Sequence, residues 1–247
     1  MSIEKIVAKV LFQLVPQDNF KGKRVITLGN QFVRMKIGEL KAEFSELEFE
    51  SNYDAASAVI DKSPLGNITG EALFKYFGAK EVQSLDMSDH ENATVIFDLN
   101  SLDLPGKLYE KFDVVYDGGT IEHVFNIVNA FKNIANMVRK GGIIIHHTPA
   151  NNYTNHGFYQ PSPTLFKDFY EANGFKVEVL KLFIWPSYPP SFSEFIMLSI
   201  EDIPRENYFA DPEKMKLHGA MEIFCVARKI EAHEKVTVPT QGYYTNP

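Results

Sequence analysis

The stretch FDVVYDGGTIEHV, residues 112–124, decides the fold of this chain. It opens with a mainly apolar run of the kind that makes a buried strand, and the run ends in Asp-Gly-Gly. Glu122 and His123 follow where the first turn of a helix is expected. A strand that delivers polar groups to its carboxyl end is typical of an α/β protein, in which ligands bind at that edge of the sheet. The stretch therefore predicts both the fold class and the place of the chemistry.

The composition limits the classes of protein to consider. The 247 residues suit one α/β domain with additions, and the net charge of −7 argues against a nucleic-acid partner. Cys225 is the only cysteine, which excludes a disulfide framework and a cysteine-rich zinc site. We find no signal peptide and no apolar run long enough to span a bilayer, so we expect a cytoplasmic protein.

Apolar runs and helical patterns alternate along the chain, as in a parallel sheet covered on both faces. We predict a Rossmann-like α/β fold with a mostly parallel seven-stranded sheet, as one domain over residues 1–230 and a polar, loosely held tail over 231–247. Two segments, 32–79 and 186–219, are expected to form caps. The predicted strands are 25–28, 82–85, 94–97, 112–116, 143–145, 175–183 and 221–228, and the predicted helices are 121–139 and 163–173.

Residues 1–15 carry apolar side chains at helical spacing, ending before Pro16. We expect this helix to pack on its own domain. A contact in a homodimer, or with a membrane surface or a partner helix, is the alternative.

Three acids, Asp86, Asp98 and Asp117, stand at or just after predicted strand ends. Each suits a turn or a helix N-cap, but together they line one edge of the sheet, where carboxylates accept the hydroxyls and amino groups of a nucleoside. The loop after the first strand holds the single Gly29, so neither a dinucleotide fingerprint nor a P-loop is present. A nucleoside ligand without phosphates fits this pattern better.

The order of these motifs resembles the class I S-adenosylmethionine-dependent methyltransferase fold over Arg24 to Phe175. The motifs concerned are LGNQ (28–31), SLDMS (84–88), FDLN (97–100), residues 112–124 and KGG (140–142). Two further stretches, DGGTIEHVFN (117–126) and HGFYQPSP (156–163), resemble a bacterial subfamily often associated with surface-glycan or secondary-metabolite clusters.

The resemblance implies S-adenosylmethionine as cofactor, with Gly29 passing close to it, Asp86 on the ribose hydroxyls and Asp98 on the adenine amino group. Thr27 stands where the superfamily often has an acid, so Asn30, Gln31 or Asp117 would replace that acid, or cofactor binding has been lost. The implied cofactor residues are Gly29, Asn30, Gln31, Asp86, Met87, Ser88, Asp98, Leu99, Asn100, Asp117, Gly118 and Gly119.

His123, with Glu122 beside it, and His156 are the candidates for catalysis, because an acceptor hydroxyl benefits from a base that takes its proton. His156 lies in the polar, aromatic loop 151–160, which we expect to bind substrate through Asn151, Asn152, His156, Tyr159 and Gln160. Each histidine has a purely structural alternative. We predict no metal, although Glu122-His123 resembles the Glu-His pair that binds magnesium in some quinone O-methyltransferases.

These features lead us to expect an O-methyltransferase for a small polar acceptor, such as a sugar or nucleotide-linked sugar for a capsule or other surface polysaccharide. A methyltransferase for an amine or for an aromatic or lipid-like metabolite is the first alternative. A non-catalytic Rossmann-like binding protein, whose first glycine motif has degraded, is the second.

Overall fold

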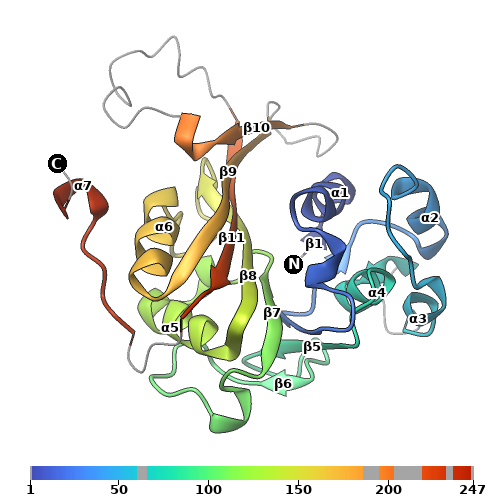
Figure 1. Cartoon of the computed structure of the whole chain (residues 1–247), viewed down its shortest axis with the longest axis horizontal. Coiled ribbons are helices and arrows are strands. Elements are labelled where there is room, and N and C mark those ends of the chain that lie inside the picture. Colours follow the sequence, from blue (N-terminus) through green and yellow to red (C-terminus); the bar gives the residue numbers. More distant parts are fainter. Residues whose placement is uncertain (1, 60–65, 186–194, 203–218, 232–235, 246–247) are drawn as a thin grey trace.

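The computed structural model describes residues 2–59, 66–185, 195–202, 219–231 and 236–245 (Figure 1). The strands are β1 (Ser2–Ile3), β2 (Arg24–Leu28), β3 (Phe32–Val33), β4 (Ile68–Thr69), β5 (Glu81–Asp86), β6 (Val95–Ile96), β7 (Phe112–Asp117), β8 (Val138–Asn151), β9 (Phe175–Trp185), β10 (Ile196–Ser199) and β11 (Ala220–Lys229). The α-helices are α1 (Lys5–Leu14), α2 (Leu40–Glu43), α3 (Tyr53–Ser57), α4 (Gly70–Tyr76), α5 (Ile127–Met137), α6 (Pro163–Ala172) and α7 (Gly242–Thr245).

The main sheet has eight strands in the order β10-β9-β11-β8-β7-β2-β5-β6. Neighbours from β8 to β6 are parallel, whereas β11 is antiparallel to both β8 and β9, and β10 is antiparallel to β9. The seven predicted strands are all present and the Rossmann-like α/β fold is confirmed, but the sheet is mixed, with four parallel and three antiparallel pairs, and matches the mostly parallel prediction only in part. The number seven is wrong, because β10 forms within the segment 186–219 that was expected to be a cap.

The parallel part of the sheet follows the usual doubly wound order. Numbered along the chain, β6-β5-β2-β7-β8 reads 3-2-1-4-5. The chain leaves β2 toward β5 on one side and later returns to β7 on the other. Ligands bind at such a reversal, outside the carboxyl ends of the strands. The fold therefore points to the ends of β2 and β7.

Alternate residues of the central strands feed two separate cores. Val114 and Tyr116 of β7 join the core that includes α1 and α4, whereas Val115 joins the core that includes α5 and α6. Figure 1 shows these two pairs of helices on opposite sides of the sheet. Because both faces are covered, the strands are apolar on both sides, which is why they appear as continuous apolar runs in the sequence.

The apolar face of α1 is used within the chain. Val7, Leu11 and Phe12 are buried against α4 and the segment after β2, and the Phe12 ring stacks on Phe77. The predicted packing of this helix on its own domain is confirmed. Segment 32–79 adds short helices to the same core, and its strands β3 and β4 form a small sheet with β1 from the start of the chain.

The predicted helix over 121–139 is wrong at both ends. Residues 121–123 form a single 3₁₀ turn, and α5 begins only at Ile127, where the Asn126 side chain accepts a hydrogen bond from the Asn129 N–H at 3.2 Å. At the other end Val138 and Arg139 already belong to β8, and Arg139 pairs with Asp113 of β7. Glu122 and His123 consequently stand on a tight turn rather than in the first turn of a long helix.

The described part of the tail is held against α6, contrary to expectation. Asn173 exchanges two hydrogen bonds with Thr237, and the Gly242 N–H donates to Asp168 at 2.9 Å. Most of segment 186–219 lies outside the described residues. Among the helices that are described, none has the length and apolar character needed to cross a membrane.

Candidate active site

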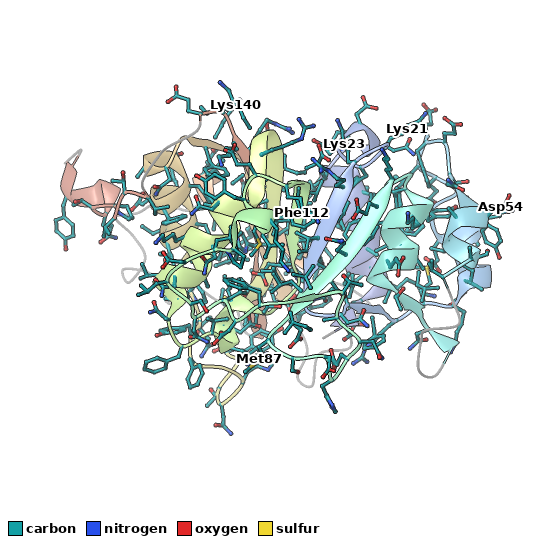
Figure 2. All side chains as sticks on the ribbon, turned by 90° about the horizontal axis from the view of Figure 1, so that it is seen from below. Lys21, Lys23, Asp54, Met87, Phe112 and Lys140 are labelled. Atoms are coloured by element: carbon teal, nitrogen blue, oxygen red, sulfur yellow. The ribbon has the colours of Figure 1, made fainter. Side chains whose placement is uncertain are left out.

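The strand order reverses between β2 and β7, whose last residues, Leu28 and Asp117, lie side by side. Gly29 leaves β2 with φ at 73°, a conformation that favours glycine. Figure 2 shows Met87, which follows β5, at the end of the molecule away from Lys23, which precedes β2. The loops predicted to bind the cofactor therefore gather at the carboxyl edge of the sheet.

Asp86 and Asp98 lie on neighbouring parts of this edge. Asp86 pairs with Ile96 of β6, and Asp98 follows two residues later. Each carboxylate accepts one backbone N–H from its own turn, Asp86 from Ser88 at 3.2 Å and Asp98 from Asn100 at 2.9 Å. Asp98 is exposed and Asp86 is half-buried. Both acids thus have the turn geometry expected of them, and both keep surface that a ligand can reach.

Gln31 fills the space where the strand order reverses. Its side chain is fully buried, and Nε2 donates to the Leu28 carbonyl at 2.7 Å. Oε1 is buried and has no hydrogen-bond partner among the described residues. A Cβ added to Gly118 would stand 2.7 Å from this oxygen, so only glycine fits beside it. The loops after β2 and β7 are therefore in close contact.

Asp117 is turned away from the edge of the sheet and into the core. Its Oδ1 accepts the Thr120 N–H at 2.8 Å, and its Oδ2 accepts the Nδ1–H of His146 at 2.7 Å. The Tyr170 hydroxyl completes the chain by donating to His146 Nε2 at 2.5 Å. All three side chains are fully buried. The Asp117 carboxylate thus holds the turn after β7 in place and has no exposed surface to offer a ligand.

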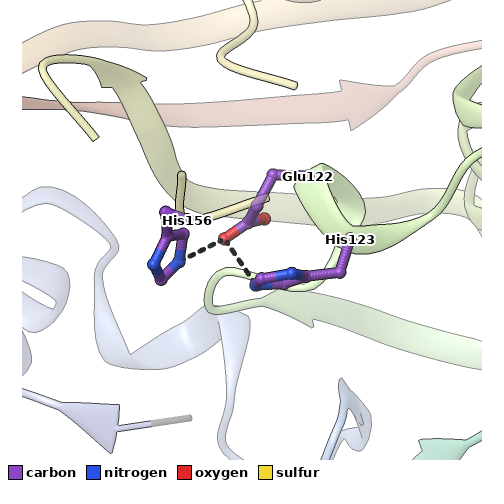
Figure 3. Close-up of side chains that lie close together, drawn as sticks. All are labelled: Glu122, His123 and His156. Carbon is purple, nitrogen blue, oxygen red and sulfur yellow. Dashed lines mark ion pairs between the residues drawn. The ribbon is translucent and has the colours of Figure 1, made fainter. Parts of the chain in front are cut away.

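Glu122, His123 and His156 come together beside that turn (Figure 3). Glu122 Oε1 lies 3.8 Å from His123 Nε2 and 3.7 Å from His156 Nε2. The Glu122 side chain is 1% exposed, whereas the two histidine side chains are 44% and 45% exposed. The three residues predicted to act in catalysis therefore form one cluster, buried at the acid and open to solvent at the imidazoles.

The surroundings favour the uncharged forms of Glu122 and His123 near neutral pH. Burial raises the pKa of Glu122 to about 8, and the negative charge of Asp117 adds to the shift. Burial also lowers the pKa of His123, and His156 lowers it further. A neutral imidazole has a nitrogen lone pair that can take a proton or bind a metal ion.

Loop 151–160 is fastened to the same turn. The backbone N–H groups of Phe158 and Tyr159 both donate to the Glu122 carbonyl, at 2.8 and 3.2 Å. A Cβ on Gly157 would stand 2.8 Å from that carbonyl oxygen, so the loop approaches closely only because this residue is glycine. His156 is in this way carried to Glu122 by backbone contacts.

The other predicted substrate residues of this loop bind their own chain in this structure. Asn152 Nδ2 donates to the Gly219 carbonyl at 2.6 Å, and Gln160 Oε1 accepts the Tyr153 N–H at 3.0 Å. The Tyr159 hydroxyl donates to the Phe125 carbonyl at 2.7 Å. These contacts shape the loop, and Asn151, Asn152 and Gln160 remain exposed.

The sequence did not predict two hydrogen-bond networks, one fully buried and one partly buried. The His146–Tyr170 pair is one of them. In the other, Glu222 of β11 pairs with His147 at 2.7 Å and accepts the Tyr153 hydroxyl. The adjacent histidines 146 and 147 gave a signal, because neighbours on a strand face opposite sides, but their partners are distant in sequence.

A cavity of about 480 Å³ opens beside β2 and β5. Its walls include Thr27, Asn30, Gln83 and Ser84. It shares Asn30 with the predicted cofactor residues and contains no member of the Glu122 cluster. The cavity therefore adjoins the candidate site on the side of β5.

No family model matches this sequence, and no curated protein does either. Among solved structures, an S-adenosylmethionine-dependent methyltransferase from Mesorhizobium loti matches at 14% identity with a TM-score of 0.44, over 90% of this chain and 98% of its own. A putative methyltransferase in complex with the Haloferax volcanii Trm112 activator matches at 14% identity with a TM-score of 0.49, over 92% and 91%.

A Burkholderia thailandensis 1,6-didemethyltoxoflavin-N1-methyltransferase, bound to its substrate and S-adenosylhomocysteine, matches at 14% identity with a TM-score of 0.43, over 92% of this chain and 78% of its own. Likenesses of this strength do not assign an activity, which has to be argued from the site.

Proposed function

We propose that this protein is an S-adenosylmethionine-dependent O-methyltransferase that acts on a small polar acceptor. The observation that carries the proposal is the series of groups at neighbouring strand ends: Gly29 directly after β2, Asp86 as the last residue of β5, and Asp98 two residues after β6. A nucleoside that lies across these strand ends can approach the backbone at Gly29, which has no side chain. It then meets the Asp86 carboxylate, which can accept its ribose hydroxyls, and the Asp98 carboxylate, which can accept the amino group of its base. A ligand with phosphates would lack a glycine-rich loop to hold them.

Gln31 offers a hydrogen-bond acceptor for the amino-acid part of the cofactor. Its Oε1 is a buried acceptor without a donor among the described residues, and it stands beside Gly118. An ammonium group is a donor of the kind this oxygen lacks. We therefore assign to Gln31 the task of the acid that is missing at Thr27. Because this side chain is fully buried, the role requires Gln31 Oε1 to become accessible when the cofactor binds.

The cluster beside the turn suits the transfer step. S-adenosylmethionine, when bound, supplies a methyl group on a positively charged sulfur. The protein has to hold the acceptor oxygen in line with that methyl group, and an alcohol must also lose its proton. His123 and His156 offer exposed imidazoles next to Glu122, and we assign to them the activation of the acceptor hydroxyl.

The loop chemistry favours a sugar-containing acceptor for a surface glycan. Asn151 and Gln160 expose amides that can bind hydroxyls, and aromatic faces form platforms for sugar rings. Phe125 and Phe158 are 70% and 64% exposed, with ring centroids 5.5 Å apart. This exposed aromatic pair favours, as second candidate, an aromatic or lipid-like acceptor.

Titration calorimetry with S-adenosylmethionine and S-adenosylhomocysteine tests the cofactor site. We expect binding, a loss of affinity of tenfold or more in Asp86→Ala, and no change in Asp89→Ala, an exposed acid of the same loop. No binding at millimolar cofactor would refute the methyltransferase proposal. It would favour a non-catalytic protein in which Gln31 simply fills the crevice.

The acceptor is tested separately. Activated sugars and small aromatic alcohols are incubated with enzyme and cofactor, and products are screened for the mass of one added methylene. A product from the aromatic set alone would overturn the sugar assignment. Equal turnover of wild type, His123→Ala and His156→Ala at saturating cofactor would overturn the role given to the histidines.

A further inference from the structure

Glu122 has one carboxylate oxygen that is buried without a hydrogen-bond donor among the described residues. His123 Nε2 and His156 Nε2 face it from 3.8 and 3.7 Å, too far for hydrogen bonds. Leaving a buried acceptor unpaired costs about 1–3 kcal/mol. Three potential ligand atoms thus surround a space that none of them fills. We propose that Glu122, His123 and His156 bind a divalent first-row transition metal ion of the zinc type.

The spacing of the three atoms suits such an ion. They lie within 4.8 Å of one another. Zinc binds nitrogen and carboxylate oxygen at about 2.0–2.2 Å, so two ligands of one tetrahedral ion stand about 3.3 Å apart. Binding requires each histidine to approach Glu122 by about half an ångström, and the two imidazole nitrogens, which lie within 4.8 Å of each other, to close to about the same spacing. Both histidine side chains are half-exposed and can reach the ion by rotation about their side-chain bonds.

The surroundings fix the acid and bring the third ligand to it. Thr148 donates to the second oxygen of Glu122 at 3.0 Å, which orients the first oxygen toward the histidines. The carbonyl of Glu122 accepts the N–H groups of Phe158 and Tyr159, and so ties the His156 loop to the turn that carries His123. Partners that orient ligands in this way are a regular part of metal sites.

The donor set selects the kind of ion. Two imidazole nitrogens and one carboxylate oxygen suit zinc and its first-row neighbours, whereas magnesium and calcium prefer oxygen ligands throughout. Three protein ligands leave one position open, as in catalytic rather than structural zinc sites. The exposed sides of His123 and His156 give solvent access to this position. This proposal differs from the expectation of a chain without metal, and it names an ion other than magnesium for Glu122-His123.

The proposal concerns binding of the ion and does not rest on methyl transfer. An imidazole whose Nε2 binds the ion has no lone pair left to take a proton, so in the metal-bound protein the two histidines are ligands and not bases. Protein stripped of metal with a chelator is titrated with zinc chloride alone, by calorimetry and by elemental analysis after dialysis. We expect one equivalent of zinc with micromolar or tighter affinity. His156→Ala and Glu122→Gln should each weaken binding at least a hundredfold, while His90→Ala, an exposed histidine elsewhere, leaves it unchanged.

Cobalt gives a second readout, because its visible spectrum reports coordination by nitrogen and oxygen in a low-symmetry site. Circular dichroism checks that each variant has folded. If Glu122→Gln does not fold, the zinc affinity of His156→Ala, which changes an exposed loop residue, tests the proposal. Stoichiometric zinc binding that survives His156→Ala, binding weaker than 100 µM, or tighter binding of magnesium than of zinc would overturn the proposal. None of these results bears on cofactor binding, which is measured without metal.

Discussion

Tyr170 and Tyr116 form a matched pair for measuring what the buried Asp117–His146–Tyr170 chain contributes to stability. Both side chains are fully buried, but only the Tyr170 hydroxyl has a hydrogen-bond partner among the described residues. Tyr170→Phe leaves His146 Nε2 buried and unpaired, which costs about 1–3 kcal/mol. Tyr116→Phe removes a hydroxyl that is already unpaired, so we expect a change within about 0.5 kcal/mol of zero or a gain in stability.

Urea unfolding measures both variants under one condition. With a slope of about 3 kcal/mol per molar for a chain of this size, the midpoint of Tyr170→Phe should fall by about 0.3–1 M. The midpoint of Tyr116→Phe should stay or rise. Equal losses in the two variants would show that the change of ring packing, and not the hydrogen bond to His146, sets the cost.

Three more perturbations test other parts of the structure. Burial opposes ionisation of Glu222, but the ion pair with His147 outweighs burial and holds the pKa of Glu222 below its usual 4.5. The ionised Glu222 therefore stabilises the folded state above pH 4.5, and this stabilisation is lost as the pH falls. Thermal melts should therefore show Glu222→Gln less stable than wild type at pH 7, with a smaller difference at pH 4. In Gly118→Ala the new Cβ would stand 2.7 Å from Gln31 Oε1, so we expect urea unfolding to show a loss of about 1–3 kcal/mol in stability. Calorimetry should show cofactor affinity lowered at least tenfold, and an unchanged affinity would refute the role given to Gln31. Lys229 is 4% exposed and donates to two backbone carbonyls at the end of α5, so Lys229→Met should lower the urea stability by about 1–3 kcal/mol, and a loss below 0.5 kcal/mol would contradict its role.

The sheet could be predicted because its strands are buried on both faces. Runs such as 25–28 and 112–116 are mainly apolar on both faces, with Thr27 and Asp113 as the polar exceptions, and this pattern is typical of a covered parallel strand. β10 could not be predicted in the same way. Its residues are exposed or half-buried at the sheet edge, and the strand exists because it pairs with β9.

The two ends of α5 are set by a capping side chain and by strand pairing, and the apolar pattern of the sequence reveals neither. Val124 has the spacing of a core residue in a long helix, and it is indeed buried, but from the loop that precedes α5. The Asn126 cap decides where α5 starts, and the pairing of Phe112 with Val138 decides where it stops.

The sequence predicted which residues lie in the candidate site better than it predicted what each of them does. Glu122 and His123 come from one motif and His156 from a later loop, and the structure brings the two together because the N–H groups of Phe158 and Tyr159 donate to the Glu122 carbonyl. The roles given to these three residues, and to the cofactor and substrate residues, stay predictions. Asp117 looked like a ligand of the cofactor, but its partners His146 and Tyr170 lie on elements whose packing the sequence does not reveal.

The position of β11 has a consequence for the growing chain. This strand lies between β8 and β9, although the ribosome makes both of them first. Until residues 220–229 emerge, β8 and β9 each have an open edge lined by apolar residues such as Ile144 and Leu182. Open edges of this kind pair readily with other chains. Nascent chains stalled before residue 220 should therefore aggregate, and native packing of the main sheet should appear only after the last strand is released.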